Sequence, residues 1–404
     1  MVHLPLALAA LATLLVGGTV AQQPPLTDAV SREPPRAWES LSGRTEDEIQ
    51  VFIQSMGPRI VGAKPPPKPV EDVSMKLVND KDHEFREPRA TDARGPCPGM
   101  NSLANHGYIS RTGVAEPAEM VTAVQEAYNM GWNIGTFITY ASLLVEGNPL
   151  TNLLSIGRHS DLTGPNPEGF PKALVGGIAT HGPFEGDTSQ SRADFYWGDN
   201  VAFNESIFDQ FLETCDRYDG LYNITSASEM RSQRYWHSRN TNPTFTFDVP
   251  RYVTAYAETT FPLAYFNDGR RERQGLAADC RQMRSFYEYG RMPEGFHRRE
   301  GSAGMTEVAN LITEFKKLNR LKAGRNIGLG NFVEAYPEVQ GLVDADGNCA
   351  MYRYFISTTL DLYPNPTGIL LESLRQNAHN MYVPLTGDPL CPELFPYGYV
   401  DYGY

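Results

Sequence analysis

A chain of 404 residues can bury a large core, either as one big domain or as two ordinary ones. Its 48 Asp and Glu residues outnumber its 35 Lys and Arg residues, which gives a formal net charge of −13. With this acidic balance, and with no basic stripe interleaved with aromatic residues, the sequence disfavours a nucleic-acid partner.

The N-terminus has the pattern of a cleaved signal peptide. Residues 4–16 are largely apolar, and small residues of the kind that signal peptidases read follow at positions 19–21. The apolar run is too short for a membrane anchor and no longer one follows, so we predict a signal peptide over residues 1–21, an extracellular protein and no membrane association. Asn204 and Asn223 open glycosylation triplets that are compatible with secretion, although such triplets also arise by chance.

Residues 22–93 are rich in proline, and we expect a poorly packed approach to the core. One helix interrupts this segment, because Thr45 and Glu48 form a capping box and the apolar residues that follow recur at helical spacing up to Gly57. The segment is an extension or in part a propeptide, and the sequence favours neither. We place the boundary of the main domain so that it covers residues 94–404.

Cys97 lies between two prolines and before a glycine, on a short rigid turn where a helix begins. Backbone amides and the helix N-terminus would stabilise a thiolate there, as in a metal ligand or a nucleophile. The alternative is a half-cystine, which on residue chemistry alone is the more common state of a cysteine in a secreted protein. Five cysteines in an oxidising compartment leave one unpaired.

The pattern of the remaining chain predicts mostly α-helices, and strand patterns are few and short. Apolar residues recur at helical spacing in several segments, and Thr244–Phe247 is the best strand candidate. There is no internal repeat and no composition break after residue 95, so we predict a single mostly α domain. The expected helices cover residues 100–106, 117–131, 132–144, 200–215, 250–263, 305–321 and 357–376.

An acidic turn at Glu185, Gly186, Asp187 and Ser189 offers two carboxylates, a hydroxyl and a backbone carbonyl within five residues. Hard oxygen ligands of this kind suit Mg²⁺. The pattern is weak by itself, since acidic turns are common and mostly solvated. His181 lies nearby but, like His106, has no evident partner at metal-ligand spacing.

Arg251 and Glu258 are seven residues apart, so two helical turns place them on one face with Thr254 and Phe261. A helix gains nothing from burying a carboxylate and a guanidinium unless they pair or perform chemistry. The spacing alone is equally compatible with an ion pair on the surface.

Taken together, these motifs resemble the fungal haem-thiolate peroxidases, the family of chloroperoxidase and the unspecific (aromatic) peroxygenases. Pro96-Cys97-Pro98 with Asn101 and Leu103–Gly107 is similar to the family's proximal haem loop, and the later motifs follow in matching order up to Cys391. The resemblance implies that Cys97 is the axial ligand of haem b iron. Gly186 together with Arg251 resembles the long-form peroxygenases.

The same resemblance implies roles for the other motifs. Glu185, Gly186, Asp187 and Ser189 would hold Mg²⁺ together with a haem propionate, Glu258 would be the acid–base group, and Arg251 would stabilise charge. A substrate channel would be lined by Phe137, Phe184 and Phe261, whereas Met130 stands where some relatives have another aromatic residue. A C-terminal disulfide would join Cys349 to Cys391, and Cys215 and Cys280 stay unassigned.

The implied activity is a secreted peroxygenase that uses hydrogen peroxide to insert oxygen into, or to oxidise, small apolar aromatic and aliphatic substrates. One rival activity is halide oxidation of the chloroperoxidase type, which chlorination of monochlorodimedone would reveal. A rival of another class is a secreted, metal-stabilised binding protein without haem, in which Cys97 forms a disulfide. A haem spectrum typical of thiolate ligation would exclude that second rival.

Overall fold

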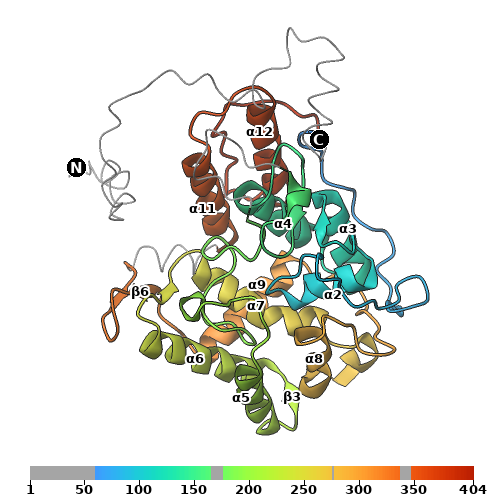
Figure 1. Ribbon diagram of the computed structural model, residues 1–404, viewed down its shortest axis with the longest axis vertical. Coiled ribbons are helices and arrows are strands. Elements are labelled where there is room, and N and C mark those ends of the chain that lie inside the picture. The colour runs from blue at the N-terminus through green and yellow to red at the C-terminus, as the bar shows by residue number, and fades with distance from the viewer. Residues whose placement is uncertain (1–59, 165–175, 275–276, 337–346) are drawn as a thin grey trace, which may run out of the picture.

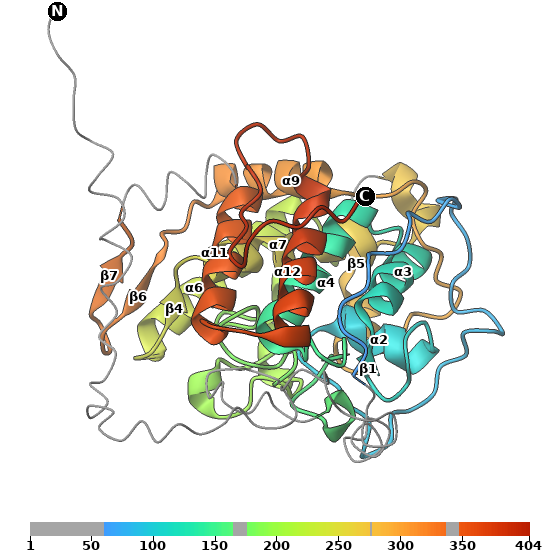
Figure 2. The same ribbon diagram turned by 90° about the horizontal axis from the view of Figure 1, so that it is seen from above.

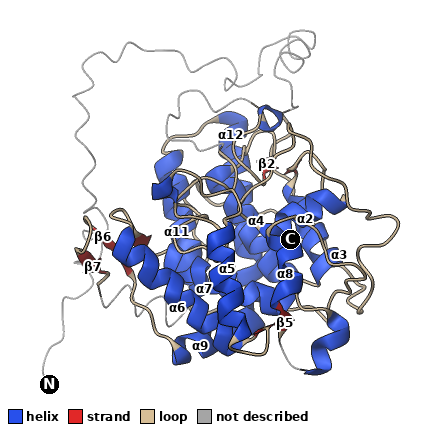
Figure 3. Ribbon diagram, turned by 60° about the horizontal axis from the view of Figure 1, so that its bottom comes forward, coloured by secondary structure: helices blue, strands red, loops and turns tan. Residues whose placement is uncertain are grey.

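The computed structural model describes residues 60–164, 176–274, 277–336 and 347–404. The predicted signal peptide and the predicted helix that begins after Thr45 lie outside these residues. Helices dominate the described chain and strands are short pieces near its edges, as Figure 3 shows. The predicted mostly α fold is therefore confirmed. The helices are α2 (Pro98–His106), α3 (Pro117–Tyr128), α4 (Trp132–Glu146), α5 (Glu205–Asp216), α6 (Ile224–Thr241), α7 (Arg251–Tyr265), α8 (Cys280–Tyr287), α9 (Met305–Leu318), α11 (Gly347–Leu362) and α12 (Gly368–Tyr382).

Two groups of helices form the body of the protein (Figure 1). In the first group, α4 packs against α3, α11 and α12; in the second, α6, α7 and α9 pack against one another and α5 packs on α6. Helix α4 is the most deeply buried because it is apolar around most of its circumference, as expected for a helix enclosed on several sides. Helix α2 contacts α3 of the first group and also α8, which packs on α5 of the second group.

The strands form three small antiparallel sheets. Strands β1 (Val114–Ala115) and β2 (Leu154–Ser155) pair, as do β3 (Leu221–Tyr222) and β5 (Ala278–Asp279). The third sheet has the order β4-β6-β7, with β4 at Thr246–Phe247, β6 at Gly324–Asn326 and β7 at Phe332–Glu334. The best strand candidate of the sequence is thus present as β4, two residues shorter than its pattern.

Local sequence explains where the helices begin and end. Pro98 is the first residue of α2, where its missing N–H is not needed, and Gly107 ends the helix in the left-handed conformation at φ 76°. Asn223 and Ser226 form a capping box at the start of α6. Helix α6 was not predicted because no apolar stripe runs along it; the short α8 was missed as well.

The single helix predicted over residues 357–376 is wrong. The structure has two helices in this region: α11 ends at Leu362 and α12 begins at Gly368, with residues 363–367 connecting them. Pro364 and Pro366 lie in this connection, and proline removes a backbone donor and clashes with the preceding turn of a helix. The break lets α11 and α12 lie beside each other against α4 (Figure 2).

Residues 60–93 are mostly exposed, as expected of a poorly packed approach to the core, but hydrogen bonds anchor the segment at several points. This segment has almost no secondary structure, yet it runs along the outer side of α3 (Figures 1 and 2). Trp132 Nε1 donates to the Pro67 carbonyl at 2.6 Å, and Arg298 Nη2 donates to the Asp72 carbonyl at 2.7 Å. Val78 is fully buried. Prolines have no N–H to satisfy, so an extended proline-rich chain is held mainly through its carbonyls.

Candidate active site

A large cavity, partly open to solvent, lies between the two helix groups; the space open to the centre of a water-sized sphere is about 280 Å³. Its walls come from α2, α3, α4 and α7 and from the loops around residues 154–156 and 184–191. Most of the lining is apolar, for example Leu103, Met120, Val124, Ile138, Ile156 and Phe266. A cavity of this size and lining suits a large, flat, mainly apolar group.

Cys97 opens into this cavity from the N-cap position of α2. Burial raises the pKa of the Cys97 thiol, while the backbone amides of Met100 and Gly99 oppose the rise by hydrogen-bonding to the sulfur. The thiol is not in a disulfide, since the other four cysteines pair with one another. The half-cystine alternative for Cys97 is therefore excluded, and the two amides are placed to favour a negative charge on the sulfur.

The polar residues after Cys97 hold its loop in place. The Asn101 side chain accepts from the Gly95 amide at 2.9 Å and donates to the Gly95 carbonyl at 2.8 Å. His106 contacts the His83 carbonyl through Nδ1 at 2.7 Å and accepts from the Met292 amide through Nε2 at 3.1 Å. Both ring nitrogens are thus engaged in a neutral imidazole, and burial lowers the pKa of His106. This histidine supports the loop and is not a metal ligand.

Arg251 and Glu258 form a bidentate pair on α7, with Nη1–Oε1 at 2.6 Å and Nη2–Oε2 at 2.8 Å. Arg251 is only 4% exposed, so the pair is not the surface ion pair that the spacing also allowed. Burial by itself would lower the pKa of Arg251, but the charge of Glu258 raises it, and the net shift is upward. Glu258, Thr254 and Phe261 line the cavity together, as their helical spacing predicts.

Gly186 brings the acidic turn into contact with α7. A Cβ atom on Gly186 would lie 2.5 Å from Arg251 Cδ, so a larger residue would displace the arginine. Arg251 Nε also donates to the Asp187 carbonyl at 2.6 Å. The acidic turn and the Arg251–Glu258 pair are therefore one connected unit.

Asp187 and Glu185 are both buried in this turn. Asp187 Oδ2 accepts from the Thr246 amide at 2.9 Å, whereas its buried Oδ1 has no hydrogen-bond partner among the described residues. Burial, with a contribution from Asp194, raises the pKa of Asp187 to about 7. The charges of His181 and Arg251 oppose this rise but do not cancel it, so burial of the Asp187 carboxylate is incompletely compensated.

His181 Nδ1 lies 2.8 Å from Glu185 Oε2, so this histidine is paired with a carboxylate of the acidic turn. Glu185, Gly186 and Ser189 all line the large cavity. No group of three or more His, Cys, Asp or Glu side chains able to hold a metal ion is found in the described ranges. A cation at this turn would therefore need oxygen ligands from the backbone, from Ser189 and from a bound molecule.

Two of the three predicted channel residues face the cavity. Phe184 and Phe261 line it, as does Met130. The placement of Phe137 is wrong: its ring is buried and lies against Phe355, with the ring centroids 6.4 Å apart. The next residues of α4, Ile138 and Thr139, face the cavity instead, because successive helical residues point about 100° apart.

Sequence reasoning missed Arg231, a buried arginine on α6 whose Nη2 lies 3.8 Å from Glu258 Oε2. It is 27 residues from Glu258 in the chain, so no spacing rule connects the two. In the sequence, Arg231 is one of several charged residues in a segment whose largely polar composition is typical of an exposed helix, so nothing marks it as buried.

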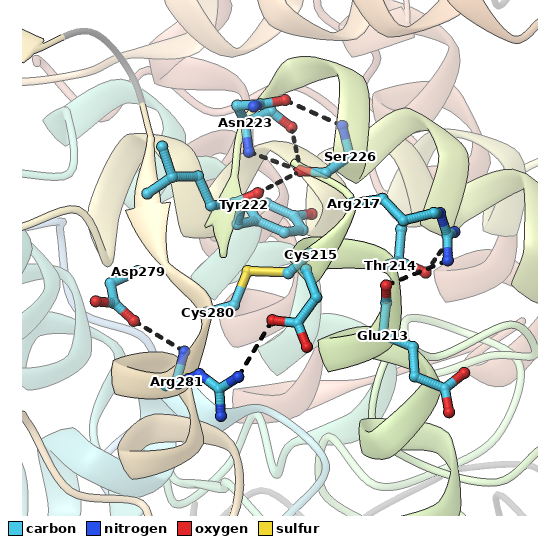
Figure 4. Close-up of a disulfide and its surroundings, with 12 residues drawn as sticks. Glu213, Thr214, Cys215, Arg217, Tyr222, Asn223, Ser226, Asp279, Cys280 and Arg281 are labelled. Atoms are coloured by element: carbon cyan, nitrogen blue, oxygen red, sulfur yellow. Dashed lines mark hydrogen bonds and ion pairs between the residues drawn. A yellow bond between two sulfur atoms is a disulfide. The ribbon is translucent and has the colours of Figure 1, made fainter. Parts of the chain in front are cut away.

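Two buried disulfides link segments that are distant in the chain. Cys349 is joined to Cys391, as the family resemblance implies. Cys215, on α5, is joined to Cys280, the first residue of α8 (Figure 4). The two predicted glycosylation acceptors, Asn204 and Asn223, are the half-buried N-caps of α5 and α6.

No helix of the described chain has the length and apolar character needed to cross a membrane.

Comparison with known proteins gives a consistent result. The family model described as "Peroxidase, family 2" matches residues 83–301. An aromatic peroxygenase of Cyclocybe aegerita is 42% identical over 364 residues, which cover 90% of this chain and 94% of the relative. An aromatic peroxygenase of Coprinellus radians is 44% identical over 59% of this chain and 89% of the relative. An aromatic peroxidase of Fusarium equiseti is 30% identical over 61% of this chain and 62% of the relative.

Proposed function

The chain belongs to peroxidase family 2, and its matches cover most of the length of two aromatic peroxygenases. We propose that it is a haem-thiolate peroxygenase. As a hydrogen-peroxide-dependent oxidoreductase, it would transfer oxygen from peroxide to small apolar organic substrates. The single observation that carries the proposal is that Cys97 and Glu258, which Arg251 holds in a bidentate pair, line the same cavity.

The cavity fits haem b, with Cys97 as the iron ligand. Its lining is mostly apolar, and the amides of Met100 and Gly99 already point at the Cys97 sulfur. A thiolate-ligated haem supplies the oxidising chemistry, since the thiolate pushes electron density that favours cleavage of the O–O bond.

In this proposal, Glu258 transfers the peroxide proton and Arg251 stabilises the negative charge that develops. Glu258 lines the cavity and, with 40% of its side chain exposed, can reach a peroxide molecule there. It would take the proton from one peroxide oxygen and return it to the leaving oxygen. Arg251 would stabilise the negative charge that develops, because it is buried and already oriented by Glu258 and the Asp187 carbonyl.

The acidic turn fits a magnesium ion. The buried, unpartnered Asp187 Oδ1 and the cavity-facing Glu185 and Ser189 offer oxygen ligands, and a haem carboxylate would complete them. The cation would neutralise the buried Asp187 and hold the edge of the cofactor.

The lining also supports a substrate class. Phe184 and Phe261 offer apolar aromatic surface beside Glu258, which suits small aromatic and aliphatic molecules. The predicted signal peptide and the two disulfides support secretion into an oxidising environment.

Reduction of the purified protein followed by carbon monoxide tests the proposal. We expect a Soret band far to the red of that of histidine-ligated haem, and we expect Cys97→Ser to lose stable haem. Cys97→His is the matched control, because a neutral ring nitrogen could retain haem but not the red-shifted band. A Cys97→Ser protein that keeps both full haem content and the red-shifted band would refute the ligand assignment.

A further inference from the structure

We propose that Arg231 is a positioning residue for Glu258, which it holds through one oxygen while the other oxygen exchanges a proton. The proposal rests on the assignment of Glu258 as the acid–base group. It concerns a residue of α6 that belongs to none of the motifs recognised in the sequence.

Arg231 is 1% exposed, and three hydrogen bonds fix its guanidinium. Nε donates to Thr259 Oγ1 at 2.9 Å, and Nη1 donates to the Thr188 carbonyl at 2.5 Å and to Thr188 Oγ1 at 2.6 Å. Burial lowers the pKa of Arg231 to about 10. None of the three acceptors is charged, so these bonds orient the guanidinium without neutralising it.

The remaining arm of the guanidinium, Nη2, is aimed at Glu258. Nη2 lies 3.8 Å from Glu258 Oε2 and has no hydrogen bond among the described residues. Glu258 is the one carboxylate paired with Arg231 in the described chain. A buried N–H without an acceptor is costly, and a small rotation of the partly exposed Glu258 side chain would satisfy it.

The Nη2 group of Arg231 can assist proton transfer by Glu258. In the structure, both Glu258 oxygens accept from Arg251, so each oxygen has one lone pair engaged and the carboxylate is held on Arg251 through both oxygens. A carboxyl that gains a proton on one oxygen must give up part of this bidentate contact. Arg231 Nη2 can then hold Oε2, which leaves Oε1 free to face the cavity and the side chain fixed in direction.

A purely structural role is the competing explanation, because Arg231 also ties α6 to the acidic turn and to α7. Arg234 offers a matched control on the same helix. It is 4% exposed, its Nε donates to the Ser189 carbonyl at 2.8 Å, and its Nη2 lies 3.9 Å from Asp194 Oδ1. It therefore holds the same turn but does not contact Glu258.

Binding of hydrogen cyanide to the haem-loaded protein tests the proposal without turnover. Cyanide must lose its proton to bind iron as the anion, whereas carbon monoxide binds without proton transfer. We expect Arg231→Leu to slow cyanide binding roughly 2- to 150-fold, which corresponds to the range of coupling energies between neighbouring groups. Carbon monoxide binding should be unchanged, and Arg234→Leu should leave both rates unchanged.

Arg231→Lys is the second variant, in case the Leu variant does not fold. It keeps the buried charge, but one ammonium group cannot bond to Thr188 and reach Glu258 together. We expect it to slow cyanide binding as well. A wild-type cyanide rate in the folded Lys variant, or an equal loss in Arg231→Leu and Arg234→Leu, would overturn the proposal.

A double-mutant cycle with Glu258→Gln separates this inference from the proposed function. If Arg231 acts through Glu258, Arg231→Leu adds no further loss in the Gln background. An equal fold-loss in both backgrounds would refute the inference and leave the function intact. If Glu258→Gln alone bound cyanide at the wild-type rate, the acid–base assignment itself would fail.

Discussion

Replacing Glu258 with Gln tests the acid–base assignment with little change in shape. The amide keeps one acceptor oxygen, so one of the two contacts to Arg251, at 2.6 and 2.8 Å, is lost. A hydrogen bond to a charged group contributes about 1.5–3 kcal/mol. Because 40% of the Glu258 side chain is exposed, we expect the free energy of unfolding to fall by an amount near the lower end of this range. Loss of the base should slow the reaction with peroxide by about 10²–10⁴-fold.

Stopped-flow mixing of the haem-loaded protein with hydrogen peroxide measures this rate as the first spectral change. Glu229→Gln is the matched control, because Glu229 pairs with the half-exposed Arg217 away from the cavity. Haem content and the carbon monoxide spectrum should be the same in both variants. A Glu258→Gln protein that reacts with peroxide at the wild-type rate would refute the reasoning and leave the pair a structural one.

Three further predictions follow from the structure. Asp187→Ala should lose a bound divalent cation and retain haem less well, with the carbon monoxide band unmoved; metal analysis that finds no divalent cation in the wild type would contradict this. The lowered pKa of His106 means that its contribution to stability is complete above its ordinary pKa of 6.5 and is lost as pH falls toward the lowered value. Urea unfolding at a series of pH values below 6.5 should show the free energy of unfolding falling as pH falls, and His106→Gln should remove this part of the pH dependence. Replacing Cys215 and Cys280 with Ser should lower the free energy of unfolding by about 2–5 kcal/mol in denaturant titration, and an unchanged midpoint would argue against a stabilising disulfide.

The parts of the site that local rules govern could be predicted from the sequence. Helix periodicity fixes the relation of Arg251 to Glu258, since seven residues are two turns. Pro98 and Gly107 likewise fix both ends of α2 and so place Cys97 at its N-terminus.

The parts that depend on packing between distant segments could not be predicted. A helical pattern shows that one side of α4 is buried, but not whether Phe137 or Ile138 faces the cavity, because the whole helix is enclosed. Arg231 reads as a surface residue, and its burial depends on acceptors from the distant Thr188 and Thr259.

Other differences arose from signals that were present in the sequence. Pro364 and Pro366 mark the break between α11 and α12, although the helix predicted over residues 357–376 ran through both of them. The prolines of residues 60–93 suggested a loose segment. Their carbonyls nevertheless accept hydrogen bonds from residues such as Trp132, which the sequence pattern does not indicate.

The most direct test of a peroxygenase is the origin of the oxygen in its product. The haem-loaded protein would be mixed with ¹⁸O-labelled hydrogen peroxide and an apolar aromatic substrate such as naphthalene, and the product analysed by mass spectrometry. We predict that the oxygen inserted into the product carries the label from peroxide. An oxidised product whose oxygen comes from water, or chlorination of monochlorodimedone without oxygen insertion, would contradict the account.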